Sequence, residues 1–286
     1  MWVVYALCSA FFAGITAVLA KAGMAGTNSN LVTALRTGVV LVFSWLMVFI
    51  VGSQGGIWEI QGETMLFLVL SGLSTGASWL CYFKALQLGD INKVVPIDKS
   101  SIILTMLLAF LLLGEGLSAL KMACVAAIGT GTFLMIEQKN SGNKKTQEKG
   151  WLIYAVFSAI FASLTSILGK VGIMGVESNL GTAIRTIVVL VMAWVVVFVT
   201  KSQGAIRDLN RKNWLFVVLS GVTTGLSWLC YYRALQDGPA SVVAPIDKLS
   251  ILVSIGFGYV FFQEKISKKA LCGLGLIVGG ALLLLV

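Results

Sequence analysis

The sequence predicts an all-α integral membrane protein in which ten transmembrane helices form two five-helix repeats of inverted topology. Two observations lead to this fold class. Hydrophobic residues make up 58% of the 286 positions and charged residues only 12%, so the chain has too little polar surface to cover a soluble globule. The sequence also matches itself without gaps at a spacing of 149 positions, which indicates an internal duplication.

The duplication is clearest in the third and fourth apolar runs of each half. The pentapeptide SWLCY at Ser78–Tyr82 recurs at Ser227–Tyr231, and the tetrapeptide PIDK at Pro96–Lys99 recurs at Pro245–Lys248. We therefore divide the chain into a first five-helix repeat (residues 1–136), a polar, basic linker (137–150) and a second five-helix repeat (151–286).

Each half contains five apolar runs of roughly 18–22 residues, the length that a helix needs to cross a bilayer. In the first half these runs cover residues 2–20, 31–51, 64–86, 94–113 and 119–136. In the second half they cover residues 151–169, 180–200, 213–235, 243–262 and 268–285. The first run is not read as a signal peptide, because it lacks a basic leader and recurs in mid-chain.

The fourth run of each half has a helix-breaking proline near its start, with an aspartate and a lysine two and three residues later. Pro96 and Pro245 leave backbone carbonyls unpaired early in their helices. Charged side chains straight afterwards are unfavourable in hydrocarbon unless they face protein or water. We therefore expect both segments to lie at a functional site.

Loop charges agree with inversion of the second half. Because five is an odd number, the second repeat must enter the membrane in the opposite direction to the first. The loops after the second and fourth runs are acidic, at Glu59, Glu63 and Glu115, whereas the equivalent loops of the second half are basic. Their basic residues are Lys201, Arg207, Arg211, Lys212, Lys265, Lys268 and Lys269. This charge distribution predicts a cytoplasmic linker, with both termini outside.

With these features the sequence resembles the EamA-type transporters of the drug/metabolite transporter superfamily. The resemblance rests on the segments Tyr82–Gln87 and Tyr231–Gln236, the proline-bearing fourth helices, and the pairs Gly114-Glu115 and Gln263-Glu264. It covers essentially the whole chain and implies a transporter of small molecules, a class whose substrates range from amino acids and sugars to choline-like amines and drugs. It also implies that both termini are cytoplasmic, whereas the loop charges predict that both lie outside.

Two hypotheses stay open for the charged residues inside the helices. Arg36 and Asp98 fall at similar membrane depth, as do Arg185 and Asp247. These pairs are either structural ion pairs or gating and substrate-binding groups on a transport path. Lys99 and Lys248 complete the two charged sets.

The third helix of each half carries hydroxyl and glycine stripes at helical spacing. The hydroxyl stripes are expected to line a polar path, whereas the glycine stripes are expected to pack closely against a neighbouring helix. These positions are Ser71, Thr75, Ser78, Gly72 and Gly76, with Ser220, Thr224, Ser227, Gly221 and Gly225 in the second half. Four aromatic residues nearby, Trp79, Tyr82, Trp228 and Tyr231, are further candidates for the substrate site.

The charge balance within the helices favours a solute that bears a carboxylate. Each half contributes one arginine, one lysine and one aspartate, which leaves a surplus of positive charge. An amino-acid-like metabolite is therefore preferred. The alternative is a choline-like cation or drug held in a cage of the four aromatic rings and complemented by the two aspartates.

The residue inventory disfavours an enzyme, a cofactor and a metal site, because the chain has no histidine, no nucleophile elbow and no nucleotide-binding loop. Transport energy must then come from a gradient, and Asp98 and Asp247 are candidates for proton coupling. The basic residues lie mostly in loops, which argues against nucleic acid. We expect a multi-pass protein of the cell membrane, monomeric, with dimerisation and a non-transporting receptor or scaffold as alternatives.

Overall fold

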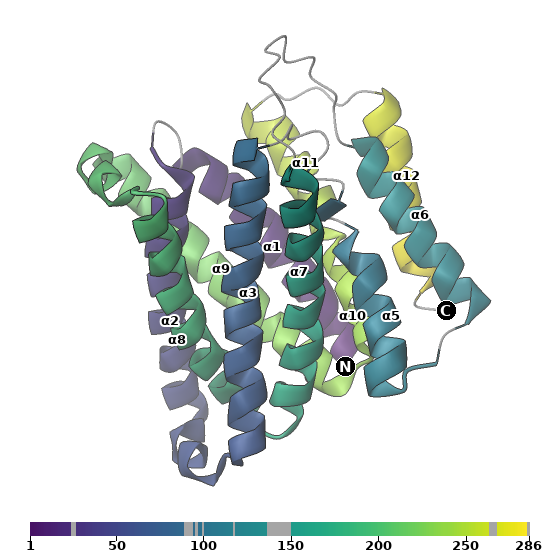
Figure 1. Ribbon diagram of the computed structural model, residues 1–286, viewed down its shortest axis with the longest axis horizontal. Coiled ribbons are helices and arrows are strands. Elements are labelled where there is room, and N and C mark those ends of the chain that lie inside the picture. Colours follow the sequence, from purple (N-terminus) through teal and green to yellow (C-terminus); the bar gives the residue numbers. More distant parts are fainter. Residues whose placement is uncertain are drawn as a thin grey trace.

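Helices form along the apolar runs of both halves, with bounds close to those predicted (Figure 1). This computed structural model describes residues 1–23, 27–88, 94, 97–98, 100–116, 118–135, 150–262 and 268–284. The first half contains α1 (Trp2–Gly23), α2 (Ser29–Val51), α3 (Gly62–Leu88), α5 (Ser101–Leu113) and α6 (Ala119–Met135). The second half contains α7 (Trp151–Met174), α8 (Ser178–Val199), α9 (Arg211–Asp237), α10 (Ala240–Asp247), α11 (Ser250–Phe262) and α12 (Lys268–Leu283).

Most of these helices have the length and composition of membrane spans. Within the described residues, seven segments are long and apolar enough to cross a membrane. They are Trp2–Ala20, Ser29–Val51, Gly62–Tyr82, Trp151–Met174, Ser178–Val199, Arg211–Asp237 and Ala240–Phe257, and two shorter apolar helices accompany them at Ser101–Leu113 and Ala119–Leu134. The chain is thus a multi-pass membrane protein of all-α architecture.

One predicted helix is interrupted. The run 243–262 is divided into α10 and α11, because the helix stops after Asp247 and restarts at Ser250. Pro245 has no backbone N–H to donate, and the turn that follows it is tightened by i to i−3 bonds from Lys248 and Leu249 to the carbonyls of Pro245 and Ile246. The interruption therefore directly follows the Pro-Ile-Asp segment.

Polar residues at the helix ends fix where the helices begin and end. The Asn28 side chain accepts backbone N–H bonds at the start of α2, Glu177 does the same for α8, and Asn210 forms a capping box with Asn213 at the start of α9. Gly114 ends α5 with a φ of 65°, a left-handed conformation that suits glycine. These ends also position the loop residue Glu115, described below.

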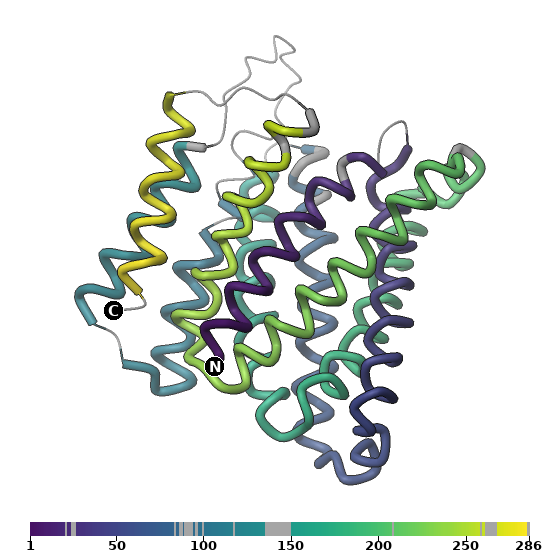
Figure 2. Tube along the Cα trace, turned by 180° about the vertical axis from the view of Figure 1, so that it is seen from behind, coloured from purple at the N-terminus to yellow at the C-terminus, as the bar shows by residue number. Residues whose placement is uncertain are grey.

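The closest helix contacts join one half of the chain to the other. Helix α1 packs along α9, and α3 packs along α7, which is the same pairing after the shift of 149 positions. Helices α2 and α8, and likewise α6 and α12, pack against their own repeat partners. Figure 2 shows α1 beside α9, and the α6–α12 pair at the edge of the bundle. The two halves are thus interlocked rather than placed side by side.

The glycine stripes lie at these crossings, as the packing interpretation predicted. A Cβ atom on Gly76 would come within 2.3 Å of the Met192 Cβ, and one on Gly225 within 2.6 Å of the Phe43 ring. Phe43 and Met192 are themselves repeat partners. Close approach of α3 to α8 and of α9 to α2 therefore requires glycine at equivalent positions of both halves.

The α6–α12 contact depends on a second pair of glycines. A Cβ on Gly131 would lie 2.4 Å from the Gly273 carbonyl oxygen, and one on Gly280 would lie 2.8 Å from the Cys124 carbonyl oxygen. Backbone atoms cannot give way as a flexible side chain can. The last helix of each half is thus held against its partner through backbone contact.

We predict that Gly131→Ala destabilises the protein by about 1–3 kcal/mol, the usual range for overpacking. Gly129→Ala is the matched control on the same helix, because its Cβ would meet only Ile103 Cδ1 at 3.7 Å. Thermal unfolding of the purified variants in detergent measures both. Equal melting temperatures for the two variants would contradict a backbone contact at Gly131.

Candidate functional site

Asp247, at the end of α10, is held by a serine from the first half. The Ser9 hydroxyl of α1 donates to an Asp247 carboxylate oxygen at 2.8 Å. Ser227 of α9 in turn donates to the Ser9 carbonyl at 3.1 Å, and the two serine hydroxyls lie 3.3 Å apart. Ser9 and Ser227 are both buried. A carboxylate at this depth is therefore bonded to a helix from the other half.

The same arrangement is repeated around Asp98. Ser158 of α7 donates to an Asp98 oxygen at 2.6 Å, and Ser78 of α3 donates to the Ser158 carbonyl at 3.1 Å. All three residues are the repeat partners of the first set. Sequence reasoning missed Ser9 and Ser158, because single serines in apolar runs resemble packing residues. Their recurrence at the repeat spacing was the available signal.

Arg185 contacts hydroxyls and aromatic rings rather than the aspartate of its own half. Its Nε donates to Ser71 Oγ at 2.9 Å and its Nη2 donates to Thr75 Oγ1 at 2.6 Å, both on α3. The guanidinium carbon lies 5.3 Å from the centre of the Trp228 ring and 4.7 Å from that of Tyr232, within cation–π range. Only 2% of this residue is exposed.

Arg36, the repeat partner of Arg185, is placed differently. Within the described residues its side chain makes no hydrogen bond, and its Nε is enclosed without an acceptor, although the residue as a whole is partly exposed. The predicted ion pairs Arg36–Asp98 and Arg185–Asp247 are accordingly not formed in this part of the chain. The aspartates are bonded to serines instead.

The hydroxyl stripe of α3 is buried at helix contacts. Ser71 donates to the Thr165 carbonyl of α7 at 2.8 Å, and Thr75 lies 3.4 Å from the Thr165 hydroxyl. Both hydroxyls also accept from Arg185. The stripe thus joins α3 to α7 and α8, which means that it links the first half to the second.

The four aromatic candidates lie in different surroundings. The Tyr231 hydroxyl lies 3.2 Å from Ser166 Oγ, and its ring packs edge-on against Tyr232. Trp79 packs against an apolar cluster of α2 and α8, whereas Tyr82 packs beside Val94 and Ala155. Trp228 faces Arg185. The structure does not bring these rings together as one group.

The second Pro-Ile-Asp-Lys segment lies at the break between α10 and α11, with Pro245 buried inside α10 and Lys248 directly after it. In the first half, Asp98 is described but Pro96 and Lys99 lie outside the described residues. The linker positions 137–149 and the pair Gln263-Glu264 also lie outside them.

Glu115 holds the beginning of α10 from the other half. One carboxylate oxygen accepts from the Ala240 N–H at 2.6 Å and the other from the Ser241 N–H at 2.8 Å. Backbone N–H groups in the first turn of a helix have no partner within the helix and favour negative charge. The Gly114-Glu115 pair therefore has a structural role that the sequence did not reveal.

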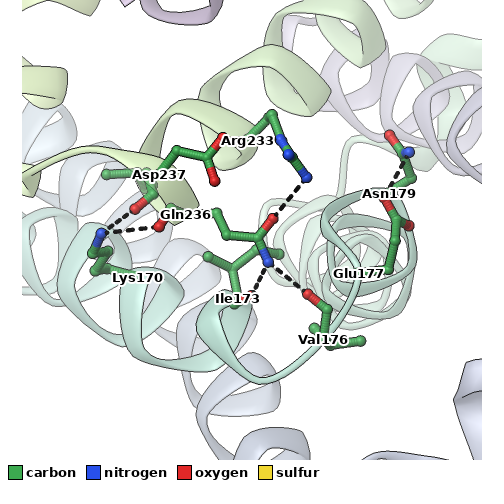
Figure 3. Close-up of polar contacts among 9 residues, drawn as sticks. Lys170, Ile173, Val176, Glu177, Asn179, Arg233, Gln236 and Asp237 are labelled. Atoms are coloured by element: carbon green, nitrogen blue, oxygen red, sulfur yellow. Dashed lines mark hydrogen bonds and ion pairs between the residues drawn. The ribbon is translucent and has the colours of Figure 1, made fainter. Parts of the chain in front are cut away.

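A further polar cluster joins the ends of α7 and α9 (Figure 3). Lys170 donates to the carbonyls of Leu235 and Gly238 at the end of α9. In return, Gln236 donates to the carbonyls of Ile173 and Val176 at the end of α7, at 2.7 and 2.8 Å. Each side chain satisfies the terminal carbonyls of the other helix, so the two ends are tied together.

Comparison with known proteins is decisive for the family. The EamA-like transporter family matches residues 1–137 and again residues 149–286. The chain belongs to the EamA-like transporter family. An EamA-like transporter in the cell membrane accounts for the apolar composition, and the two matches agree closely with the repeat found in the sequence.

Two related proteins carry transporter names. An "Uncharacterized transporter in cobO 3'region" from a Sinorhizobium species is 47% identical over 138 residues, which is 48% of this EamA-like transporter and 98% of that protein. The "Uncharacterized transporter YxxF" of Bacillus subtilis (strain 168) is 26% identical over 212 residues, 73% of this chain and 66% of that one. A solved crystal structure matches the fold with a TM-score of 0.81 at 16% identity, over 99% of this chain and 96% of that chain.

We predict that Ser9 and Asp247 of this EamA-like transporter are energetically coupled. A hydrogen bond to a charged group contributes about 1.5–3 kcal/mol, and removing either partner of a bonded pair leaves the other unsatisfied. A double-mutant cycle of Ser9→Ala and Asp247→Ala, measured by thermal unfolding, should give a coupling free energy of at least about 0.5 kcal/mol.

Ser163→Ala combined with Asp247→Ala is the control cycle. Ser163 is equally buried on α7, but its hydroxyl donates to the Ile160 carbonyl of its own helix at 2.7 Å. Additive effects are expected there. Additivity in the Ser9 cycle as well would show that the serine–aspartate contact contributes nothing.

Proposed function

We propose that this EamA-like transporter is a secondary active transporter that works by alternating access and carries a small, carboxylate-bearing metabolite such as an amino acid. In this proposal, residues 1–136 and 151–286 are five-helix repeats of inverted topology that make up ten transmembrane segments, joined by the linker 137–150. The residues proposed for gating and substrate binding are Arg36, Asp98 and Lys99 with Arg185, Asp247 and Lys248, together with Trp79, Tyr82, Trp228 and Tyr231.

The observation that carries the proposal is the pair of equivalent serine–aspartate contacts between the halves. Ser9 donates a hydrogen bond to Asp247 and Ser158 donates one to Asp98, so each half binds the aspartate of the other half. Relative motion of two repeats changes such contacts first on one side and then on the other. A carboxylate whose hydrogen bonds change between two states also changes its proton affinity, which is the requirement for proton coupling.

The choline-like alternative is less favoured by the surroundings of the aromatic rings. A cation cage needs several ring faces turned to one point. The Trp228 ring already faces the Arg185 guanidinium, and Trp79 packs in a separate apolar cluster. A positively charged arginine beside these rings would repel a cation, so the choline-like solute is less favoured.

Inverted topology predicts that equivalent loop positions face opposite sides of the membrane. Glu63 and Lys212 are exposed repeat partners at the beginnings of α3 and α9. In a background without the five native cysteines, single cysteines at these two positions should react with an impermeant maleimide from opposite sides. Reaction of both from the same side would exclude inversion, whereas the side from which the cysteine at position 212 reacts decides the absolute orientation.

Proton coupling predicts a specific failure in the aspartate variants. In reconstituted vesicles, the wild type should accumulate a carboxylate solute from a mixed amino-acid pool when a pH gradient is applied. Asp98→Asn and Asp247→Asn should keep exchange of that solute but lose its accumulation, because an amide cannot carry the proton. Gradient-driven accumulation by both variants would refute coupling through these residues, and uptake of choline but no carboxylate would favour the cation alternative.

A further inference from the structure

Arg36 and Arg185 start from equivalent backbone positions. A Cβ on Gly72 would lie 3.2 Å from the Arg185 carbonyl oxygen, and a Cβ on Gly221 would lie 3.1 Å from the Arg36 carbonyl oxygen. The crossing of α8 over α3 is therefore equivalent, in position along the helices and in distance, to the crossing of α2 over α9. Any difference between the two arginines must lie in their side chains and in what those side chains contact.

The acceptors that bind Arg185 are also duplicated. Ser71 and Thr75, which accept from Arg185, correspond to Ser220 and Thr224 on α9. Ser220 donates to the Val217 carbonyl at 3.0 Å and Thr224 donates to the Ser220 carbonyl at 2.6 Å, so both hydroxyls bond to their own helix. Neither accepts from Arg36. The residues that could bind Arg36 as Ser71 and Thr75 bind Arg185 are thus present, but these hydrogen bonds are not formed.

The side chain of Arg36 remains available to a ligand. Its Nε is enclosed and has no acceptor. Its two terminal nitrogens are not enclosed in this way, and the residue is partly exposed. Nor does Arg36 stack on Trp79 in the described part of the chain, whereas Arg185 stacks on Trp228, the repeat partner of that ring. An enclosed N–H without an acceptor is unfavourable, so this guanidinium favours a bound anion.

We propose that the two arginines have different roles: Arg36 binds the carboxylate of the transported solute, and Arg185 is a structural brace between α8 and α3. A guanidinium presents two parallel N–H groups that match the two oxygens of a carboxylate. Arg185 donates through Nε and Nη2 to Ser71 and Thr75. Its Nη1 is enclosed without an acceptor, as the Nε of Arg36 is, but the whole side chain is almost fully buried and is closed to a solute, whereas Arg36 is partly exposed. This assignment rests on the proposed transport of a carboxylate-bearing solute.

The first test needs no ligand. Arg185→Gln removes two interhelical hydrogen bonds and a cation–π contact, so it should lower the melting temperature of the purified protein by several degrees. Arg36→Gln removes a guanidinium whose Nε has no acceptor, so it should leave the melting temperature unchanged or raise it. A loss for Arg36→Gln equal to that for Arg185→Gln would overturn the division of roles.

The second test uses defined probes. Glycine betaine and choline share a trimethylammonium group, but only betaine has a carboxylate. Betaine, sodium acetate and sodium glutamate should raise the melting temperature of the wild type above that in choline chloride or sodium chloride of matched ionic strength. The shift should be lost in Arg36→Gln. It should require about tenfold more probe in Arg36→Lys, because an ammonium group lacks the two parallel N–H groups of a guanidinium. It should persist in the control Arg207→Gln, which changes an exposed loop arginine.

A carboxylate-dependent shift that survives Arg36→Gln, or the absence of any such shift in the wild type, would overturn the assignment. Vesicle uptake separates this result from the proposed function. Carboxylate uptake retained by Arg36→Gln would reject the role of Arg36 and leave transport standing. An Arg36-dependent shift in a wild type that moves none of the solutes would support the binding site and reject transport.

Discussion

Polar groups inside a membrane protein must find partners within the protein, and here several buried side chains find them in the other half of the chain. Arg185 of the second half bonds to Ser71 and Thr75 of the first, while Ser9 of the first half bonds to Asp247 of the second. A buried polar group left without its partner is unfavourable by about 1–3 kcal/mol, and by more if it is charged. The burial of these groups therefore depends on both halves being in place, which explains why the closest helix contacts also run between halves.

The helices were predictable because apolar runs and their repetition can be read directly along the sequence. Helices α2 and α8 begin and end within two residues of the predicted runs 31–51 and 180–200. The interruption after Asp247 was not predicted, because hydropathy does not distinguish one long helix from two short ones. Pro245 was the local signal, and the tight turn behind it completes the break.

Residue partners were harder to predict than helices. Arg185 and Asp247 were paired because they fall at similar depth in the membrane, but depth gives only the position along the membrane normal. It does not say which way a side chain points or which half faces it. Ser9 and Ser158 gave no hydropathy signal at all, because one hydroxyl hardly changes the mean of an apolar run. Their role follows only once α1 is placed against α9 and α7 against α3.

Helix α10 shows how strongly a short element depends on such contacts. A helix of eight residues is too short to be stable alone, since nucleation is unfavourable and few internal bonds repay it. Its first turn is capped by Glu115 and its last residue is held by Ser9, both from the first half. Although α10 belongs to the second half in sequence, its polar anchors are in the first. The position of α10 therefore depends on contacts between the two halves.

The unequal state of the two arginines follows from conformation as well as from sequence. The arginine, serine and threonine positions are identical in both repeats, and the backbones cross at equivalent points. Some residues near the two crossings differ between the repeats: Tyr232, whose ring contacts Arg185, corresponds in sequence to Phe83, and Met192 beside Gly76 corresponds to Phe43 beside Gly225. Under alternating access, two halves with identical contacts would give two states of equal free energy. We infer that differences among the residues around a shared polar framework shift that balance, while the framework itself stays the same in both halves. In our proposal this difference gives one arginine a structural role and leaves its repeat partner to bind the solute.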